Sequence, residues 1–366
     1  MSTLTKSEPA AAERQPAQTR QSFFGQPHRG RLLAISSAAL AGAVLLAAAQ
    51  GSVAIPITTL LQVLVSKLGI IQIDQMWPQS HETILLEIRL PRIVLAGLVG
   101  AALGTAGASY QGLFRNPLAD PYLIGVASGA GLGATVALLL PATLLSASVI
   151  LVPLMAFGGA LLTVAVTYGV ARVGRTLPVP TLLLAGVAIA SLASSATSFL
   201  MAMSGEELRA IFAWLMGSFA LGSWQRVAGT LPYIVVSCAV LLLLARQVNV
   251  LQVGEEEARQ LGLNTERAKF LLVVFSSLAT AAAVSVSGLI GFVGLIVPHV
   301  ARLLGGPDYR TVLPVSAVLG AAFLICADTL ARTLLSPVEL PVGIVTAFSG
   351  APFFLYLLRR RKQELM

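Results

Sequence analysis

The chain has little charge. Only 11% of its 366 residues are Asp, Glu, Lys or Arg, whereas soluble domains carry about 25% charged residues. Hydrophobic residues make up 56%, and the mean hydropathy is +0.84. So few polar side chains cannot cover a soluble globule, but they suit a surface that faces lipid. The composition therefore excludes an ordinary soluble domain and indicates a membrane protein.

Two further absences narrow the class. The strands of a membrane β-barrel need segments of roughly ten residues with alternating hydrophobicity, and apolar runs such as 235–245 do not alternate. The only cysteines, Cys238 and Cys326, lie inside apolar segments, which argues against a disulfide framework. Neither cysteine has the neighbours of a metal site, so we expect apolar packing there, with no metal and no cofactor.

The chain also lacks an ATP-binding motif. A P-loop needs a lysine directly after glycine in G-x-x-x-x-G-K-[ST]. The four lysines are at positions 6, 67, 269 and 362, and none follows a glycine. No catalytic cluster is evident either, so we expect neither an ATPase nor another enzyme.

Long apolar segments are what the chain has in quantity. A bilayer core is crossed by about 20 apolar residues in a helix. We predict an all-α polytopic membrane protein with about ten transmembrane helices, in a membrane domain over 32–362. The ten segments are 32–50, 92–112, 122–140, 149–170, 181–203, 227–245, 268–287, 289–304, 313–331 and 341–358.

The remaining segments are polar or mixed. Residues 1–31 form a polar stretch with five basic residues, and we expect a disordered cytoplasmic tail there. The first apolar segment is longer than the hydrophobic core of a typical signal peptide, so we read it as an uncleaved helix. A cleaved signal is the alternative, because Ala47–Ala49 are small. For the mixed segment 204–226 two interpretations stay open, a short helix in the membrane interface or a loop with two belt tryptophans.

The basic residues predict the orientation. An even number of helices places both termini on one side, and 18 of the 24 Lys and Arg residues then fall on that side. Cytoplasmic loops are the ones enriched in Lys and Arg, so both termini should be cytoplasmic. The same rule accounts for the net charge of +8 without any nucleic-acid partner.

Glycines in the second segment predict close helix packing. Gly97, Gly100, Gly104 and Gly107 share one helical face, where small residues let a neighbouring helix approach. Gln111 follows on the same segment. A polar side chain at this depth must face protein or water, which makes Gln111 a candidate pore residue.

The eighth segment is interrupted by glycines and by Pro298. Helices broken in this way often line a translocation path. His299 follows the proline, and we interpret it as a structural hydrogen-bonding residue rather than a proton relay, because no chain of acids accompanies it. On the ninth segment Asp328 and Arg332 have the spacing of an intrahelical ion pair.

The longest interior cytoplasmic loop predicts a short helix over 254–262. Three acids, Glu255, Glu256 and Glu257, suit a helix N-terminus, and Glu255 is spaced to pair with Arg259. Gly262 is a plausible residue to end the helix. The helix is either a solvated surface element or a plug that docks into a partner.

Together these motifs resemble the FecCD family, the permeases of iron-siderophore, haem and vitamin B12 importers. The likeness covers roughly 32–358. The matching runs are Arg89–Arg92, Arg115–Pro121, Gly291–His299 and Glu339–Gly343. The resemblance implies a vitamin B12 importer permease-like fold and a homodimer or heterodimer of permeases around one pore. It also implies two cytoplasmic ATP-binding subunits, an extracytoplasmic substrate-binding protein and surrounding lipid.

The resemblance also suggests roles for particular residues. Residues 254–262 would be the coupling helix that docks into the ATPase, with Ala258 and Leu261 packing against it. The cytoplasmic gate would lie at Pro178, Val179 and Pro180, whose two prolines make the connection stiff.

A third implied role concerns the outer face. The family's binding proteins dock acidic residues onto arginines, which here would be Arg89, Arg92 and Arg332. The alternative is that these arginines anchor helix ends at the headgroups, with Arg332 held by Asp328.

We therefore expect the permease subunit of an ABC importer for an iron-siderophore complex, in the inner membrane of a bacterium. Haem or vitamin B12 is the alternative cargo. A transporter of another class, coupled to ions, would need intramembrane acids, and Asp328 is the only candidate.

Overall fold

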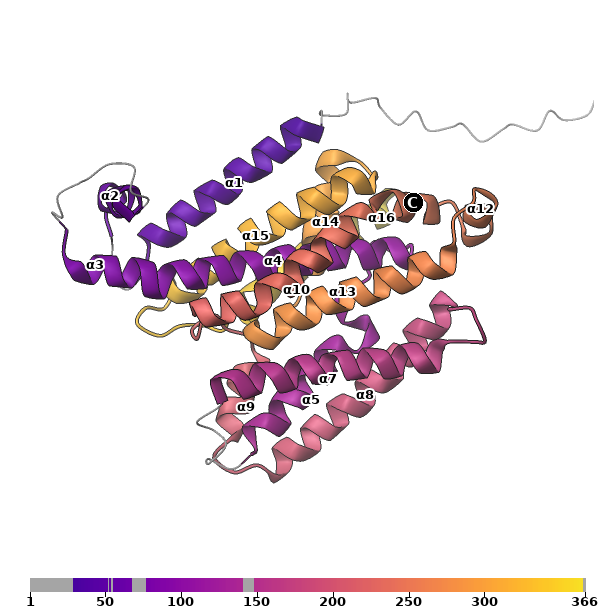
Figure 1. Ribbon diagram of the computed structural model, residues 1–366, viewed down its shortest axis with the longest axis horizontal. Helices are drawn as coiled ribbons and strands as arrows, with labels where there is room; N and C mark the ends of the chain where they lie inside the picture. Colours follow the sequence, from indigo (N-terminus) through magenta and orange to yellow (C-terminus); the bar gives the residue numbers. More distant parts are fainter. Residues whose placement is uncertain (1–28, 52, 54, 68–76, 141–147, 365–366) are drawn as a thin grey trace, which may run out of the picture.

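The structure is a computed structural model that describes residues 29–364 except 52, 54, 68–76 and 141–147 (Figure 1). In the described part the regular structure is helical, and a single isolated bridge joins Val173 to Thr176. The predicted all-α class is confirmed. The predicted tail lies outside the described residues up to position 28, and the first helix begins at Arg29.

Each of the ten predicted segments coincides with a helix. These helices are α1 (Arg29–Ala49), α4 (Leu90–Leu113), α5 (Val126–Leu138), α7 (Ser148–Ala171), α8 (Val179–Met203), α10 (Trp224–Leu243), α13 (Thr265–Ser287), α14 (Val293–Gly305), α15 (Tyr309–Thr333) and α16 (Val342–Glu364). Within the described ranges, six helices are long and apolar enough to cross a membrane: α1, α7, α8, α10, α13 and α15.

Shorter elements connect the long helices. They are α2 (Ile57–Lys67), α3 (Gln79–Thr83), the π-helical η1 (Ile84–Arg89), the 3-10 helix η2 (Pro121–Ile124), α9 (Leu208–Leu215), α11 (Ala245–Leu251) and α12 (Glu255–Gln260). The helix α9 decides between the two interpretations of 204–226 in favour of a short helix.

Two predicted segments are shorter helices than expected. The helices α5 and α14 have 13 residues each, because irregular backbone precedes both. Before α5, Gly125 has a φ of +91°, and before α14, Phe292 has a φ of +68°. The predicted break in the eighth segment is confirmed, but it lies at 288–292, whereas Pro298 is inside α14. The Tyr122 hydroxyl donates to the Ile290 carbonyl at 2.9 Å and so gives a hydrogen bond to one backbone group in this irregular segment.

The helix α4 is the centre of the larger group of helices. It packs against α13, α14 and α15 and is buried along most of its length (Figure 1). Gly100 and Gly320 of α15 lie backbone against backbone, so that a Cβ on either would clash with the carbonyl of the other. The equivalent atom on Gly104 would clash with the Ser316 carbonyl. The predicted packing face is thereby confirmed.

The helices α5, α7 and α8 pack together as a second group, in the lower part of Figure 1. The bundle has two ends, which we name by their short helices. The α12 end also carries the 172–178 connection and the start of α15. The α9 end carries the start of α4 and the end of α15.

Candidate functional site

At the α12 end, the predicted short helix forms at Glu255–Gln260. It follows Gly254, and its first turn carries three acids that favour the positive end of the helix dipole. Gly262 has a φ of +84°, and the Leu263 amide donates to the Ala258 carbonyl at 3.0 Å. These bonds close the helix at the predicted glycine.

The ion pairs of α12 differ from the expected pattern. Glu255 pairs with Lys269 of α13, at 2.9 Å between Oε2 and Nζ. Arg259 lies instead near Glu256 at 3.8 Å and Glu266 at 3.4 Å. The predicted pairing of Glu255 with Arg259 was wrong, because α12 leans on the start of α13 and Glu255 finds a buried cation there.

The outer face of α12 is open to a partner. Leu261 is 70% exposed, and Glu256, Glu257 and Arg259 are exposed beside it. Ala258 is fully buried inside its own chain. An exposed leucine among charged side chains can act as an apolar contact for another subunit, whereas Ala258 seats α12 on the bundle.

The predicted gate residues lie where the 172–178 connection enters α8. Pro178 is the residue before the helix, Val179 begins it and Pro180 occupies its first turn. Pro178 and Val179 are half-buried and Pro180 is exposed. The preceding Leu177 is buried and hydrogen-bonded on both sides of its backbone. The role of these residues as a constriction stays a prediction.

Gln111 lies within protein. Its side chain is 1% exposed, and its Nε2 donates to the Gly294 carbonyl at 3.1 Å. Its Oε1 accepts a hydrogen bond from Arg302. Both ends of the amide are therefore bonded to α14. These contacts support a role in joining α4 to α14 and give no support to the predicted pore role.

At the α9 end, Arg92 is held by two acids. Its Nη2 lies 2.8 Å from Oδ1 of Asp328 and its Nη1 lies 3.0 Å from Oε2 of Glu339. Arg332 approaches Asp328 only to 4.0 Å. Asp328 was predicted to hold Arg332, but its main partner is Arg92, because the close packing of α4 against α15 brings Arg92 nearer.

The other two arginines contact α1. Arg89 donates to the Ala48 carbonyl at 2.7 Å and to Ala49 at 3.2 Å, and also to Val53. Arg332 donates to Ala47. The last carbonyls of a helix attract cations, so both arginines satisfy the C-terminus of α1.

The three arginines predicted to dock the binding protein are buried within the chain. Arg89 is 3% exposed, and Arg92 and Arg332 are each 8% exposed. Their contacts support the alternative that they secure helix ends within the chain. Docking of a binding protein on these arginines stays a prediction.

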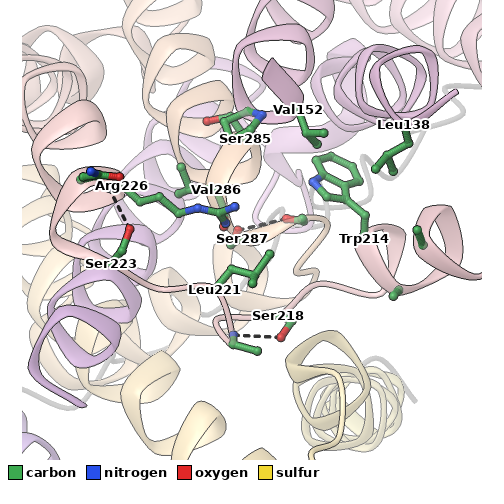
Figure 2. Close-up of a pocket in the computed structure, with 16 residues that line it drawn as sticks. Leu138, Val152, Trp214, Ser218, Leu221, Ser223, Arg226, Ser285, Val286 and Ser287 are labelled. Atoms are coloured by element: carbon green, nitrogen blue, oxygen red, sulfur yellow. Dashed lines mark hydrogen bonds between the residues drawn. The ribbon is translucent and has the colours of Figure 1, made fainter. Parts of the chain in front are cut away.

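A cavity of about 580 Å³ lies at the α9 end (Figure 2). Its wall is mostly apolar and includes Trp214 and Val152, while Arg226 supplies a cation and donates to the Val286 carbonyl at 3.3 Å. Five helices contribute to it, so no local sequence pattern indicates it. Its size is typical of a small-molecule pocket. Among the described residues, no cluster of His, Cys, Asp and Glu is suited to a metal ion.

Comparison with known proteins gives three consistent results. The FecCD transport family matches residues 39–360. The chain is 52% identical over 285 residues to the cobalamin import system permease protein BtuC of Halobacterium salinarum, covering 78% of this chain and 76% of that protein. It is 43% identical over 293 residues to the hemin transport system permease protein HmuU of Yersinia pestis, covering 80% and 86%.

The third result concerns solved structures. One described as an inward-facing ABC transporter of the metal-chelate type superposes with a TM-score of 0.78 at 30% identity. The match covers 90% of this chain and 99% of that chain. An identity of 30% over almost the whole length extends the similarity beyond the shared helical architecture.

Proposed function

Because the chain belongs to the FecCD transport family and is the permease of an ABC importer, we propose that it carries a large metal chelate across the cytoplasmic membrane. It is a membrane subunit rather than an enzyme, and the ATPase activity lies in a separate subunit. The family match over 39–360, together with the metal-chelate transporter fold, is the observation that supports this cargo class.

Cobalamin is the cargo that we propose first. The 52% identity to the cobalamin permease exceeds the 43% identity to the hemin permease. An iron-siderophore complex, the cargo expected from the family resemblance, is the second candidate.

The structure also speaks against an ion-coupled secondary transporter. Such a transporter needs an intramembrane acid available to an ion. Asp328, the one candidate from the sequence, is 2% exposed and hydrogen-bonded by Arg92 at 2.8–3.1 Å. The acid therefore serves helix packing.

Uptake assays test the cargo. Cells that lack their own chelate permeases would receive this chain with its ATPase and binding protein, and would be given labelled cyanocobalamin, hemin or a ferric siderophore. We expect ATP-dependent uptake of cyanocobalamin. Uptake of the siderophore alone would establish the second candidate, and uptake of none of the three would contradict the proposed cargo class.

We further propose how the permease is assembled. A second permease completes the pore, two ATP-binding subunits dock at the α12 end, and a binding protein docks at the α9 end. Both termini then face the cytoplasm, as the distribution of Lys and Arg favours. Val179 contributes to the narrowest cytoplasmic point. A pore that is wide at Val179 in every nucleotide state would contradict this gate.

A further inference from the structure

A buried ammonium group joins three segments at the α12 end. Lys269, in the second turn of α13, is 1% exposed. Its Nζ lies 2.9 Å from Oε2 of Glu255, 2.8 Å from Oε1 of Glu266 and 2.8 Å from the carbonyl oxygen of Leu177. An ammonium has three N–H donors and no acceptor. Three acceptors at these distances therefore satisfy it completely.

The Leu177 backbone is held on both sides. Its carbonyl accepts from Lys269, and its amide donates to Oε2 of Glu266 at 2.8 Å. Leu177 is also 2% exposed, so packing limits its movement. The next residues are Pro178 and Val179, and the fixed φ of proline passes the orientation of Leu177 directly to the start of α8.

The same group holds α12. Glu255 is the first residue of α12, and its carboxylate reaches Lys269. A second link runs from Arg259 of α12 to Glu266 at 3.4 Å and to the Thr265 hydroxyl at 3.1 Å. The two acids and two bases balance in charge. Hydrogen bonds to charged groups are short and about twice as strong as neutral ones, so the cluster is a firm junction.

We propose that Lys269 is the positioning residue that transmits a displacement of α12 through Leu177 to the gate residues 178–180. The proposal rests on the proposed roles of α12 in docking the ATPase and of 178–180 as the gate. One side chain separates the two elements, because the same ammonium binds Glu255 of α12 and the carbonyl of Leu177. When the ATPase moves α12, the ammonium carries Leu177 with it and turns the first residues of α8.

Removal of the ammonium has a specific consequence. In Lys269→Met the apolar stem is kept, but Glu255 loses its partner and the Leu177 carbonyl loses its donor. The helices α12 and α13 keep their own backbone hydrogen bonds. The chain should therefore still assemble with the ATPase, while the gate follows α12 only through the longer contact of Arg259 with Glu266, which still accepts from the Leu177 amide.

The experiment uses the full transporter in proteoliposomes. In a cysteine-free background, a spin label is attached through Thr176→Cys, an exposed position next to the gate. The distance between the labels on the two permeases of the dimer is measured with and without ATP. Cargo uptake and ATP hydrolysis are measured on the same samples. The variants are Lys269→Met, Lys269→Arg and Glu255→Gln, with Arg267→Met as the matched control, an exposed cation two residues away on the same helix.

We expect Lys269→Met to lower cargo taken up per ATP hydrolysed at least tenfold and to remove most of the ATP-dependent change at Thr176. Lys269→Arg should recover part of both, because its guanidinium still donates to several acceptors. Glu255→Gln, in which Lys269 keeps its other two acceptors, should give a smaller loss of the same kind. Arg267→Met should match the parent transporter.

Two comparisons separate this proposal from the roles on which it rests. Leu261→Asp removes only the outward contact of α12. If Leu261→Asp abolishes uptake while Lys269→Met and Glu255→Gln keep normal uptake per ATP and a normal change at Thr176, the relay is overturned and the coupling role stands. If Leu261→Asp also has no effect, the coupling role fails. Should Lys269→Met not fold, Glu255→Gln decides: normal uptake per ATP and a normal change at Thr176 in that variant overturn the relay.

Discussion

Arg92 and Asp328 form a buried ion pair across 236 positions of sequence, with Nη2 of Arg92 2.8 Å from Oδ1 of Asp328. The pair joins the start of α4 to the last turns of α15, at the end where Glu339 also reaches Arg92. A buried pair costs desolvation energy for both charges, so its removal as a unit and the removal of one member have different consequences.

The first prediction separates these two cases. Arg92→Met leaves the buried Asp328 with only the 4.0 Å approach of Arg332 and should destabilise the protein by up to about 3–5 kcal/mol. The double variant Arg92→Met/Asp328→Leu should recover most of that loss. Thermal unfolding of the detergent-solubilised protein measures both, with exposed Arg209→Met as the control. Additive losses in the double variant would mean that the pair is not coupled.

The second prediction concerns docking on Arg89, Arg92 and Arg332. If the binding protein uses them, Arg332→Glu should slow its association, and more strongly at low salt, because screening by salt weakens charge steering. If they only secure helix ends, Arg332→Glu should reduce the amount of folded protein. Arg332→Gln controls for the loss of charge. Kinetics on the folded fraction decide: wild-type association and salt dependence would refute docking.

The third prediction tests the exposed face of α12. Leu261 is 70% exposed and does not secure the fold. Leu261→Asp should therefore leave the thermal stability of the permease within about 0.5 kcal/mol, yet weaken binding of the ATPase and abolish cargo-stimulated hydrolysis. Leu261→Met, which keeps the apolar contact, is the control. Unchanged cargo-stimulated hydrolysis in Leu261→Asp would contradict the coupling role.

The fourth prediction is a dependence of stability on pH at Asp308, in the turn before α15. Burial raises the pKa of this carboxyl, but hydrogen bonds from Arg310 and Asn249 outweigh it and hold the pKa at about 2, below its usual 3.8. A lowered pKa in the folded state stabilises the protein above pH 3.8, and this contribution is lost as pH falls from 3.8 towards 2.

The measurement compares the wild type with Asp308→Asn. The Tm of the wild type should approach that of the variant as pH falls through this range, because protonation then removes from the wild type the charge that the variant never has. At pH 5 to 7 the wild type should be the more stable. A constant Tm difference across the whole range would exclude the carboxylate as its cause.

The fifth prediction concerns helix contact. A side chain at Gly104 would meet the Ser316 backbone, whereas Gly169 of α7 has open space around it. Gly104→Val should force α4 away from α15 and cost about 1–3 kcal/mol or more. Gly169→Val makes the same chemical change on another helix and should be nearly neutral. Equal yields and Tm values for the two variants would contradict the packing role of Gly104.

Much of the architecture follows from local sequence. Apolar segment length predicts the position of ten helices, two of which, α5 and α14, are shorter than expected. The three acids with Gly262 predict α12. These signals act within one helix or turn. The glycine face of α4 indicates a close neighbour for the same reason. It does not indicate which helix that neighbour is.

Local sequence could not identify ion-pair partners that lie on different helices. Spacing suggested Arg259 for Glu255, but the structure gives Lys269. Arg332 does approach Asp328 to 4.0 Å as its spacing predicted, but Arg92 lies nearer at 2.8 Å. In both cases spacing along one helix missed the nearer cation, which comes from another helix. For Glu255 the alternative was an exposed i,i+4 pair, worth about 0.3–0.5 kcal/mol, and the buried Lys269 of α13 competes successfully with it. Asp328 is itself buried, and the packing of α4 against α15 brings Arg92 closer to it than Arg332. Nothing in the sequence around Lys269 distinguishes it from an exposed lysine, and only the structure shows that it is buried.

The contact between Gly100 and Gly320 limits how this fold can change over generations. A methyl group at either position meets the backbone carbonyl of the other, so neither glycine can be replaced without moving the two helices. Because the clash is with the backbone, changing the counterpart residue does not relieve it, and the close approach of α4 and α15 depends on both glycines. We therefore expect variation that keeps this contact and adapts the transporter to a new cargo to fall at other positions.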